Sequence, residues 1–503
     1  MTDSAILGRS GKRVYPLDAL RGTAILLMVL ASLLPFGVLP SWMYHAQSPP
    51  PSHQFNPDLP GITWVDMVFP FFIFSMGAAF PLALSRRIAN GRSNAQMIWP
   101  IIKRGFALLG FAIYNYHMTP SKMVFKSQNV AWVLGLVGFF LMFPMWGRLP
   151  WKLDKIKSNI LKYGSWVLAA CIISVLKYNN GQGFSPFKSN IILLVLADLS
   201  VFGAFIWLFT RENILLRLGL LGILFAIRLS CTVDTSWINS VGNTFEIPFL
   251  AGLIKNLISQ EKLEYVKWIY NFSWMFQWRF LKYLFIIIPA TIIGDLLVVW
   301  MNKDENDHLR KGWGKIRLAA IVCIMLGFIL IVLVGLKVRL CLATFLCCAG
   351  MGITGLFFVR NPQSNRERLL NRMYLWGIFW LILGLLFEPY EGGIKKDPST
   401  MSYYFVMSGL ATFLLIAFSI TIDIFRKRKY LKLLINNGQN PMIAYVSNSN
   451  LLIPVLALTG LRPIVNSIYS NQPWLGFVIA VGLTLVIASI VSLFTHNKIF
   501  LRT

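Results

Sequence analysis

Histidine is scarce in this sequence, with five copies in 503 residues, and two of them lie in one short proline-rich segment. His45 and His53 belong to residues 40–61, PSWMYHAQSPPPSHQFNPDLPG, which contain no lysine or arginine. A neutral imidazole can take a proton from an attacking amine or hydroxyl, or accept an acyl group as a nucleophile. A loop histidine can equally be a solvated or capping residue, so residue type alone leaves both interpretations open.

Asp66, in TWVDMVFPFF, stands at the beginning of the apolar run that follows this segment. A carboxylate at this place could orient a nearby imidazole and fix which ring nitrogen carries the proton. An acidic residue in the first turn of a helix is also favoured by the helix dipole, without any catalytic role. Both roles stay open for Asp66.

Asp18 and Arg21, in LDALRG, are three residues apart and therefore share one face of the first predicted helix. They stand at its cytoplasmic end, where they could organise the mouth of a cofactor site. The alternative is a structural ion pair in which the long Arg21 side chain reaches out to the membrane surface.

Other polar residues could serve a cofactor from within the bundle. Lys103 and Arg104 form a basic pair that could bind phosphate groups, although plain membrane topology also places such pairs in cytoplasmic loops. Asn440 and Tyr445 could donate hydrogen bonds, or could simply pack between helices. No dinucleotide-binding, Walker A, zinc-protease or nucleophile-elbow motif occurs in a credible context. The six cysteines show no CxxC spacing, so neither a disulfide framework nor a metal site is predicted.

The composition decides which elements must position these residues. Hydrophobic residues make up 56% of the chain and charged residues only 13%, about half the share found in soluble globular proteins. Such a surface must face lipid, so membrane lipid is the expected surrounding partner. The net charge of +27 does not indicate nucleic-acid binding, because the basic residues sit in short clusters between apolar runs.

The apolar runs predict an all-α, polytopic transmembrane helix bundle that forms a single domain over residues 1–503. A span needs about 20 apolar residues, which gives about 14 spans, with a range of about 11 to 14 because two helix pairs have short connections. The predicted spans are 17–39, 62–85, 98–115, 129–147, 159–176, 190–209, 213–229, 280–300, 316–335, 338–359, 373–389, 402–423, 441–460 and 474–494.

The distribution of lysine and arginine predicts the orientation of these spans. Basic residues precede the first span, which we interpret as a retained helix rather than a cleaved signal peptide, and they recur in alternate loops. Both termini are therefore expected on the cytoplasmic side. Two loops face outward: residues 40–61, and residues 231–278, whose amphipathic part could lie on the membrane surface.

Several segments carry a family resemblance. The run LDALRGTAILLMVL is followed by His45-Ala46 and then by GITWVDMVFPFFIFSMGAAFPLAL. Later segments that fit the same pattern are IKRGFALLG at 102–110, EGGIKKDPSTMSYYF at 391–405, GQNPMIAYV at 438–446 and NKIF at 497–500. Together they resemble the catalytic membrane domain of the heparan-alpha-glucosaminide N-acetyltransferase family, and especially its uncharacterised bacterial branch of transmembrane acyltransferases.

The resemblance implies a reaction and a site. The family moves an acetyl group from cytoplasmic acetyl-CoA to an amino sugar across the membrane, using a non-cytoplasmic histidine. That histidine falls on His45, and the aspartate of the following block falls on Asp66. About ten extra residues separate the two, so His53 is a rival for the catalytic position. A family asparagine at the outer end of the first helix has no counterpart near Ser32.

We therefore expect a transmembrane acetyltransferase that acts on an amino sugar or glycan, with His45 as general base or acetyl carrier. Asp18, Arg21, Lys103, Arg104, Asn440 and Tyr445 are its expected acetyl-CoA-binding residues. The alternative is a multi-helix transporter or flippase for a glycan or lipid-linked sugar, which would explain the spans equally well. The expected location is a bacterial cytoplasmic membrane, a homodimer is an open option, and the sequence does not specify the natural acceptor.

Overall fold

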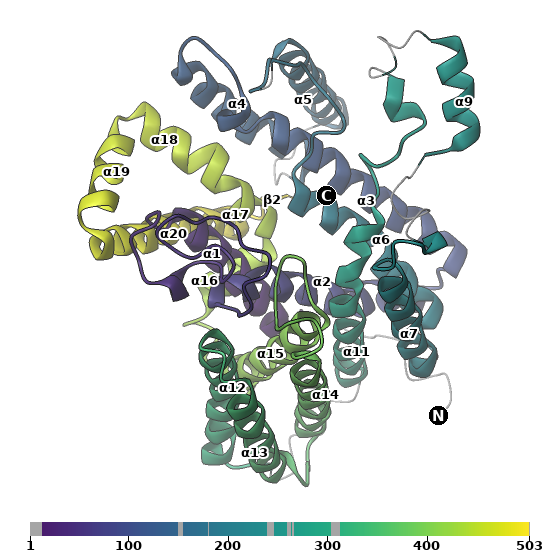
Figure 1. The fold of residues 1–503 in the computed structure, drawn as a ribbon, viewed down its shortest axis with the longest axis vertical. Helices are drawn as coiled ribbons and strands as arrows, with labels where there is room; N and C mark the ends of the chain where they lie inside the picture. Colours follow the sequence, from purple (N-terminus) through teal and green to yellow (C-terminus); the bar gives the residue numbers. More distant parts are fainter. Residues whose placement is uncertain are drawn as a thin grey trace. The chain divides into compact units, whose positions relative to one another are not determined.

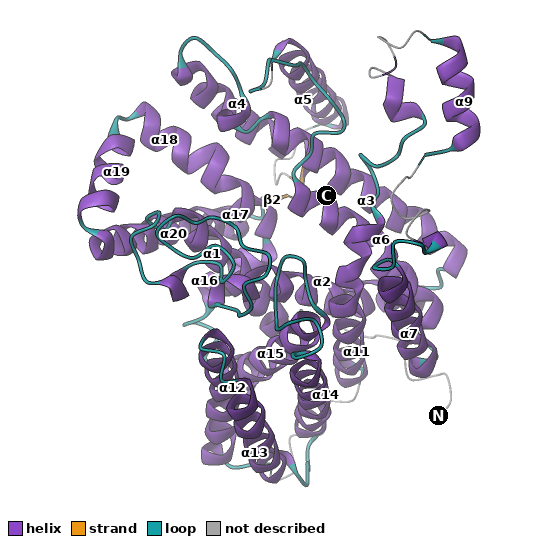
Figure 2. Ribbon diagram, in the orientation of Figure 1, coloured by secondary structure: helices purple, strands orange, loops and turns teal. Residues whose placement is uncertain are grey.

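The computed structural model describes residues 13–148, 154–179, 181–238, 246–258, 263, 266–302 and 312–501. These residues are almost entirely helical (Figure 2), and the two strands among them, β1 Gly147–Arg148 and β2 Phe500–Leu501, have two residues each. The prediction of an all-α, polytopic helix bundle is confirmed. Thirteen helices of the described chain are long and apolar enough to cross a membrane.

Thirteen of the predicted spans correspond to these helices. The remaining one, 213–229, is α7 Ile214–Ser230, whose 17 residues lie at the lower limit of what can span a bilayer. Because α7 decides whether the number of spans is even, the shared sidedness of the two termini depends on it. That sidedness stays a prediction.

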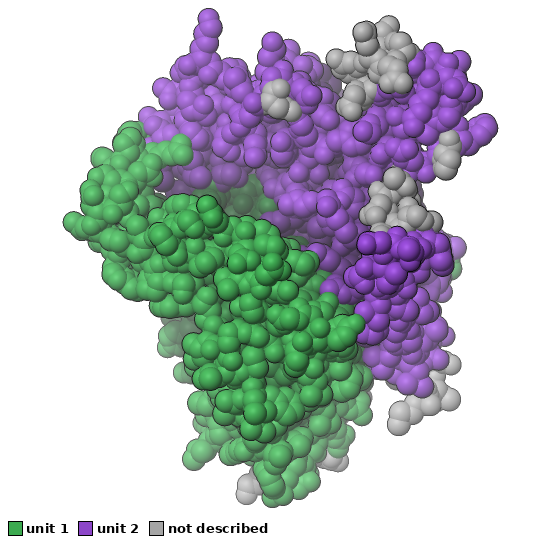
Figure 3. All heavy atoms as spheres, viewed as in Figure 1, with its two compact units in different colours: residues 1–93, 285–448, 459–500 green, residues 94–284, 449–458, 501–503 purple. Residues whose placement is uncertain are grey.

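The chain divides into two compact units, coloured green and purple in Figure 3. Unit 1 comprises residues 1–93, 285–448 and 459–500, and unit 2 comprises residues 94–284, 449–458 and 501–503. The helices of unit 1 are α1 Tyr15–Leu33, α2 Trp64–Ala89, α11 Leu284–Met301, α12 Lys315–Lys337, α13 Cys341–Val359, α14 Asn365–Phe387, α15 Met401–Ser419, α16 Lys432–Gln439, α17 Pro441–Ser447, α19 Leu461–Asn471 and α20 Pro473–His496.

The core of unit 1 is α15, which is buried on nearly every face and packs against α1, α2, α12 and α14. A helix that is apolar all round belongs inside a bundle, since it has no face to offer to water. The neighbouring helices α12, α13 and α14 pack in sequence order and run side by side in Figure 1. A short π-helix, Ile420–Ile424, extends α15 to the end of its apolar segment.

Two glycines bring α1 and α16 into backbone contact. A Cβ on Gly22 would lie 1.9 Å from the carbonyl oxygen of Leu434, and one on Gly438 would lie 1.7 Å from that of Asp18. No larger residue fits either place without moving a helix, in line with the small-residue contacts of membrane bundles. This contact holds the cytoplasmic end of α1, with Asp18 and Arg21, against α16.

Unit 2 contains α3 Asn94–His117, α4 Gln128–Trp146, α5 Lys155–Val175, α6 Ile191–Thr210, α7, α9 Pro248–Leu257 and α18 Ile453–Leu458. Its main packing pairs are α3 with α6, α4 with α5 and α4 with α18. The predicted outer loop at 231–278 contains α9, whose Phe249, Leu253 and Leu257 side chains are exposed. This exposed apolar row fits the amphipathic pattern of that segment.

Candidate active site

The loop before α2 and the first turn of that helix bring His45 and Asp66 into contact. Nδ1 of His45 lies 2.7 Å from Oδ1 of Asp66. The Asp66 side chain is 2% exposed, whereas that of His45 is 44% exposed. The pair therefore joins a buried carboxylate to an imidazole whose outer edge is open.

Asp66 is fixed because it also caps its own helix. Oδ2 accepts hydrogen bonds from the backbone N–H groups of Thr63, at 2.9 Å, and Ala46, at 3.1 Å. The hydroxyl of Tyr403, on α15, donates to the Asp66 carbonyl oxygen at 2.7 Å. Backbone N–H groups can only donate, so they suit an ionised carboxylate, which in turn accepts a proton from Nδ1 of His45. Nε2 of His45 is then the nitrogen with a free lone pair.

A third residue, Lys396, completes the group. Its Nζ lies 3.1 Å from Nδ1 and 3.4 Å from Nε2 of His45, although 351 residues separate the two in the sequence. Burial lowers the pKa of Lys396, and the negative charges of Asp66 and Asp397 oppose that shift. Lys396 belongs to the segment EGGIKKDPSTMSYYF, but the sequence gave no reason to single it out.

Gln47 ties the Lys396 loop to the His45 loop. Its Oε1 accepts the backbone N–H groups of Lys396, at 3.2 Å, and Asp397, at 2.8 Å. A second tie runs from the Gly61 N–H to the carbonyl oxygen of Ile394, at 2.8 Å. The Gln47 side chain is buried, so these bonds are shielded from water. The proline-rich segment at 40–61 is thus an ordered loop.

The rival histidine, His53, has a different environment. Its Nε2 accepts the backbone N–H of Gly37 at 3.0 Å. Its ring lies against Phe36, with centroids 4.2 Å apart, and against Tyr44, at 4.5 Å. His53 thus holds the entrance of the loop to its middle, and the lone pair that a base would need is already engaged.

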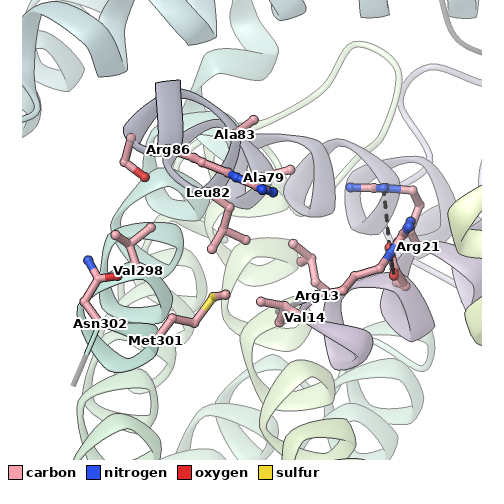
Figure 4. Close-up of a pocket in the computed structure, with 13 residues that line it drawn as sticks. Arg13, Val14, Arg21, Ala79, Leu82, Ala83, Arg86, Val298, Met301 and Asn302 are labelled. Carbon is pink, nitrogen blue, oxygen red and sulfur yellow. Dashed lines mark hydrogen bonds and ion pairs between the residues drawn. The ribbon is translucent and has the colours of Figure 1, made fainter. Parts of the chain in front are cut away.

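A cavity of about 330 Å³ lies at the other end of α2 (Figure 4). Three guanidinium groups line it, those of Arg13, Arg21 and Arg86, together with one carboxylate, Asp18. Asp18 pairs with Arg13 at 2.6 Å and lies 3.9 Å from Arg21. The excess of positive charge suits an anionic ligand, and guanidinium groups match the geometry of phosphate oxygens.

Arg21 forms the inner wall of this cavity. Its Nε and Nη2 donate to the hydroxyl and the carbonyl oxygen of Ser75 on α2, both at 3.2 Å, and Nη1 donates to the carbonyl of Gly438 at 3.4 Å. These bonds fix the guanidinium in place. The opposite wall comes from the end of α11, with Val298, Met301 and Asn302.

The remaining predicted residues lie elsewhere. Lys103 and Arg104 are on α3, in unit 2, and do not line this cavity. Asn440 is buried between α16 and α17, where its Nδ2 donates to the carbonyl of Ile499 at 2.8 Å. Tyr445 is half-buried on α17. Neither of these two residues is among the cavity lining.

The two sites lie at opposite ends of one helix. Asp66 is in the first turn of α2 and Arg86 in its last. Twenty residues of α-helix correspond to about 30 Å, the thickness of the apolar part of a bilayer. The described residues contain no group of three or more His, Cys, Asp or Glu side chains that could hold a metal ion.

Comparisons with known proteins match the part of the chain that carries the His45–Asp66 pair. Residues 13–248 match a family model described as a domain of unknown function (DUF5009). The chain is also 29% identical over 131 residues to heparan-alpha-glucosaminide N-acetyltransferase of Mus musculus. That match covers 26% of this chain and 18% of the mouse protein. The similarity supports a distant relation to a membrane N-acetyltransferase.

Proposed function

We propose that this protein is a transmembrane acetyltransferase that moves an acetyl group from cytoplasmic acetyl-CoA to an amino sugar or glycan on the other side of the membrane. The observation that carries the proposal is the His45–Asp66 pair, with an ionised carboxylate behind a half-exposed imidazole. Charge distribution and the resemblance at His45-Ala46 both favour an outward location for this pair. The arginine-lined cavity at the other end of α2 supports a cytoplasmic binding site for an anionic cosubstrate.

The chemistry that these residues support is proton transfer at Nε2 of His45. Asp66 holds the proton on Nδ1, so Nε2 can take a proton from the acceptor amine as its nitrogen attacks the thioester carbonyl. The new C–N bond forms, the C–S bond breaks and the thiol of CoA leaves with a proton. In the two-step alternative, Nε2 itself carries the acetyl group before the amine takes it.

At the cytoplasmic end, Arg13, Arg21 and Arg86 would bind the phosphate groups of acetyl-CoA. Two of these residues, Arg13 and Arg86, replace the predicted pair Lys103 and Arg104 in this part of the proposal. The only support for an amino sugar as the acceptor comes from the resemblance and from the name of the mouse relative. A bacterial cytoplasmic membrane is part of the same proposal.

The test is reconstitution in liposomes with radiolabelled acetyl-CoA on the side of the arginine cavity and glucosamine on the other. The expected result is labelled N-acetylglucosamine with the native chain and none with His45→Ala, while His53→Ala stays active. Full activity of His45→Ala together with loss in His53→Ala would reverse the assignment. Sugar flux without acetylation, and without acetyl-CoA binding, would instead identify the protein as a carrier.

A further inference from the structure

Lys396 has an unusual position for a lysine. Its Nζ approaches the two nitrogens of the His45 ring instead of forming an ion pair with a carboxylate. Asp66 and Asp397 act on it only at longer range. Removing a charged group from water costs free energy, so a buried ammonium needs a compensating role.

The loop is built to keep Lys396 there. Gln47, only two residues after His45, accepts the backbone N–H groups of both Lys396 and Asp397. On the far side, Ser399 donates its hydroxyl proton to the Lys396 carbonyl oxygen at 2.5 Å. The same short segment therefore positions the imidazole and, through Gln47, the backbone from which the ammonium extends.

We propose that Lys396 is a catalytic residue that stabilises the negative charge which develops on the acetyl carbonyl oxygen during transfer at His45. This inference rests on the proposed acetyl transfer. It adds to it the group that an acyl transfer requires besides a base, a positive or N–H donor aimed at the developing oxyanion.

The distances suit this role in both routes. A nucleophile that hydrogen-bonds to Nε2 lies about 3 Å from it. Lys396 Nζ lies 3.4 Å from the same nitrogen. When the amine attacks the carbonyl carbon, the π electron pair moves to the oxygen, within reach of the ammonium. If Nε2 carries the acetyl group, the carbonyl oxygen is only two bonds away from Nε2. In each case Lys396 keeps its proton, and the oxyanion collapses as the bond to the leaving group breaks.

The charge on Lys396 also predicts a pH dependence. The titratable groups that face it are His45, Asp66 and its neighbour Asp397. Burial lowers the pKa of Lys396 despite the two carboxylates. The ammonium is therefore lost at a lower pH than for an exposed lysine, and the transfer rate falls with it as the pH rises.

The experiment compares Lys396→Met with Lys395→Met in proteoliposomes. Lys395 is the adjacent residue, and its backbone N–H donates to the Thr400 hydroxyl. We expect Lys396→Met to lower kcat by about 10²-fold with an unchanged KM for acetyl-CoA, as for other oxyanion donors. We expect Lys395→Met to stay within about threefold of the native rate, since it leaves that donor in place. The fall in rate at alkaline pH should disappear in Lys396→Met and persist in Lys395→Met.

Thermal unfolding and acetyl-CoA binding separate chemistry from folding. Lys396→Met should bind acetyl-CoA as the native chain does, and Lys396→Gln should repeat the loss of kcat. A native kcat in both variants would overturn the role of Lys396 while leaving the proposed function intact. A native chain that acetylates no acceptor would overturn the proposed function, and the role of Lys396 with it.

Discussion

Two histidines, one in each unit, occupy opposite environments. In unit 1, His45 is 44% exposed, with Nδ1 on a carboxylate and Nε2 facing the loop mouth. In unit 2, His117 is fully buried at the end of α3. Its Nδ1 donates to the helix carbonyl of Ile113 at 2.8 Å, and its Nε2 accepts the N–H of Ser185 at 3.4 Å.

The difference teaches what makes a histidine available for chemistry. His117 is enclosed by the rings of Tyr178 and Phe184, and backbone groups occupy both of its nitrogens. It can neither gain nor lose a proton without breaking a structural bond. His45 has one nitrogen committed to Asp66 and the other open, which is the arrangement of a base held in one tautomer. Burial alone would have ranked the two in the wrong order.

The largest effect is expected from replacing the two histidines in turn. His45→Ala should lower the acetylation rate by roughly 10⁴-fold, since it removes the proton acceptor. His117→Ala should leave the rate per folded molecule near native and lower the unfolding free energy by about 2 kcal/mol, because it removes two buried hydrogen bonds. The measurements are the acetyl-transfer assay and thermal unfolding in detergent. Stability loss in His45→Ala, with chemistry lost in His117→Ala, would refute the comparison.

The next effect sharpens the role of the carboxylate. Asp66→Asn can keep an oxygen towards the Thr63 and Ala46 N–H groups, but it turns an amide NH₂ towards Nδ1 of His45. The imidazole then carries its proton on Nε2, and the rate should fall by about 10³-fold with little change in stability. Nitrogen NMR of labelled histidine in the variant reports the tautomer directly. An unchanged tautomer with a reduced rate would contradict this explanation.

The arginine cavity should affect binding rather than chemistry. Arg13→Gln combined with Arg86→Gln removes two charged contacts of about 1.5–3 kcal/mol each, so the affinity for acetyl-CoA should fall by about 10²-fold. Arg92→Gln, an exposed arginine beyond the same end of α2, is the matched control. Equilibrium binding of acetyl-CoA checks the prediction. Equal losses in the control would attribute the effect to general surface charge.

A smaller effect is expected from the tie between the two loops. Gln47→Ala removes the acceptor that holds the backbone of Lys396 and Asp397, so the ammonium should move relative to His45. A misplacement of this kind should lower kcat by about tenfold without removing any reacting group. Hydrogen exchange of residues 391–400, measured by mass spectrometry, should rise in parallel. A lower kcat with unchanged exchange would separate the two effects.

The smallest expected effect concerns His53. His53→Ala removes the acceptor for the Gly37 N–H and the ring contacts with Phe36 and Tyr44. The unfolding free energy should fall by about 1 kcal/mol, and the rate should stay within about threefold of native. Steady-state kinetics and thermal unfolding check this. A loss of rate as large as that of His45→Ala would restore His53 as the catalytic candidate.

The helical architecture could be predicted from the sequence because apolar runs of bilayer length encode each span locally. Thirteen spans follow this rule, and only α7 stands at the limit of length. The contact of His45 with Asp66 could also be anticipated, because the loop and the helix that follows it are adjacent in the chain. The resemblance supplied the choice between the two loop histidines, and the backbone bond of His53 was not visible in its sequence.

The residues that the sequence did not identify depend on distant contacts. Lys396 meets His45 across 351 residues, and no local pattern distinguishes it from Lys395. Arg13 and Arg86 looked like ordinary topology charges, whereas Lys103 and Arg104 looked like a phosphate site. Which basic residue lines a cavity is decided by helix packing, here by α1, α2 and α11, and packing is not encoded in charge clusters.

The contact between α1 and α16 has a consequence for biosynthesis. Arg21 is synthesised early, but its carbonyl partner Gly438 follows 417 residues later. Until α16 enters the membrane, the first helix carries a guanidinium and an exposed glycine face without their final partners. The inner wall of the cavity is thus completed only near the end of translation. A chain truncated before α16 would insert most of its helices and still lack a finished cosubstrate cavity.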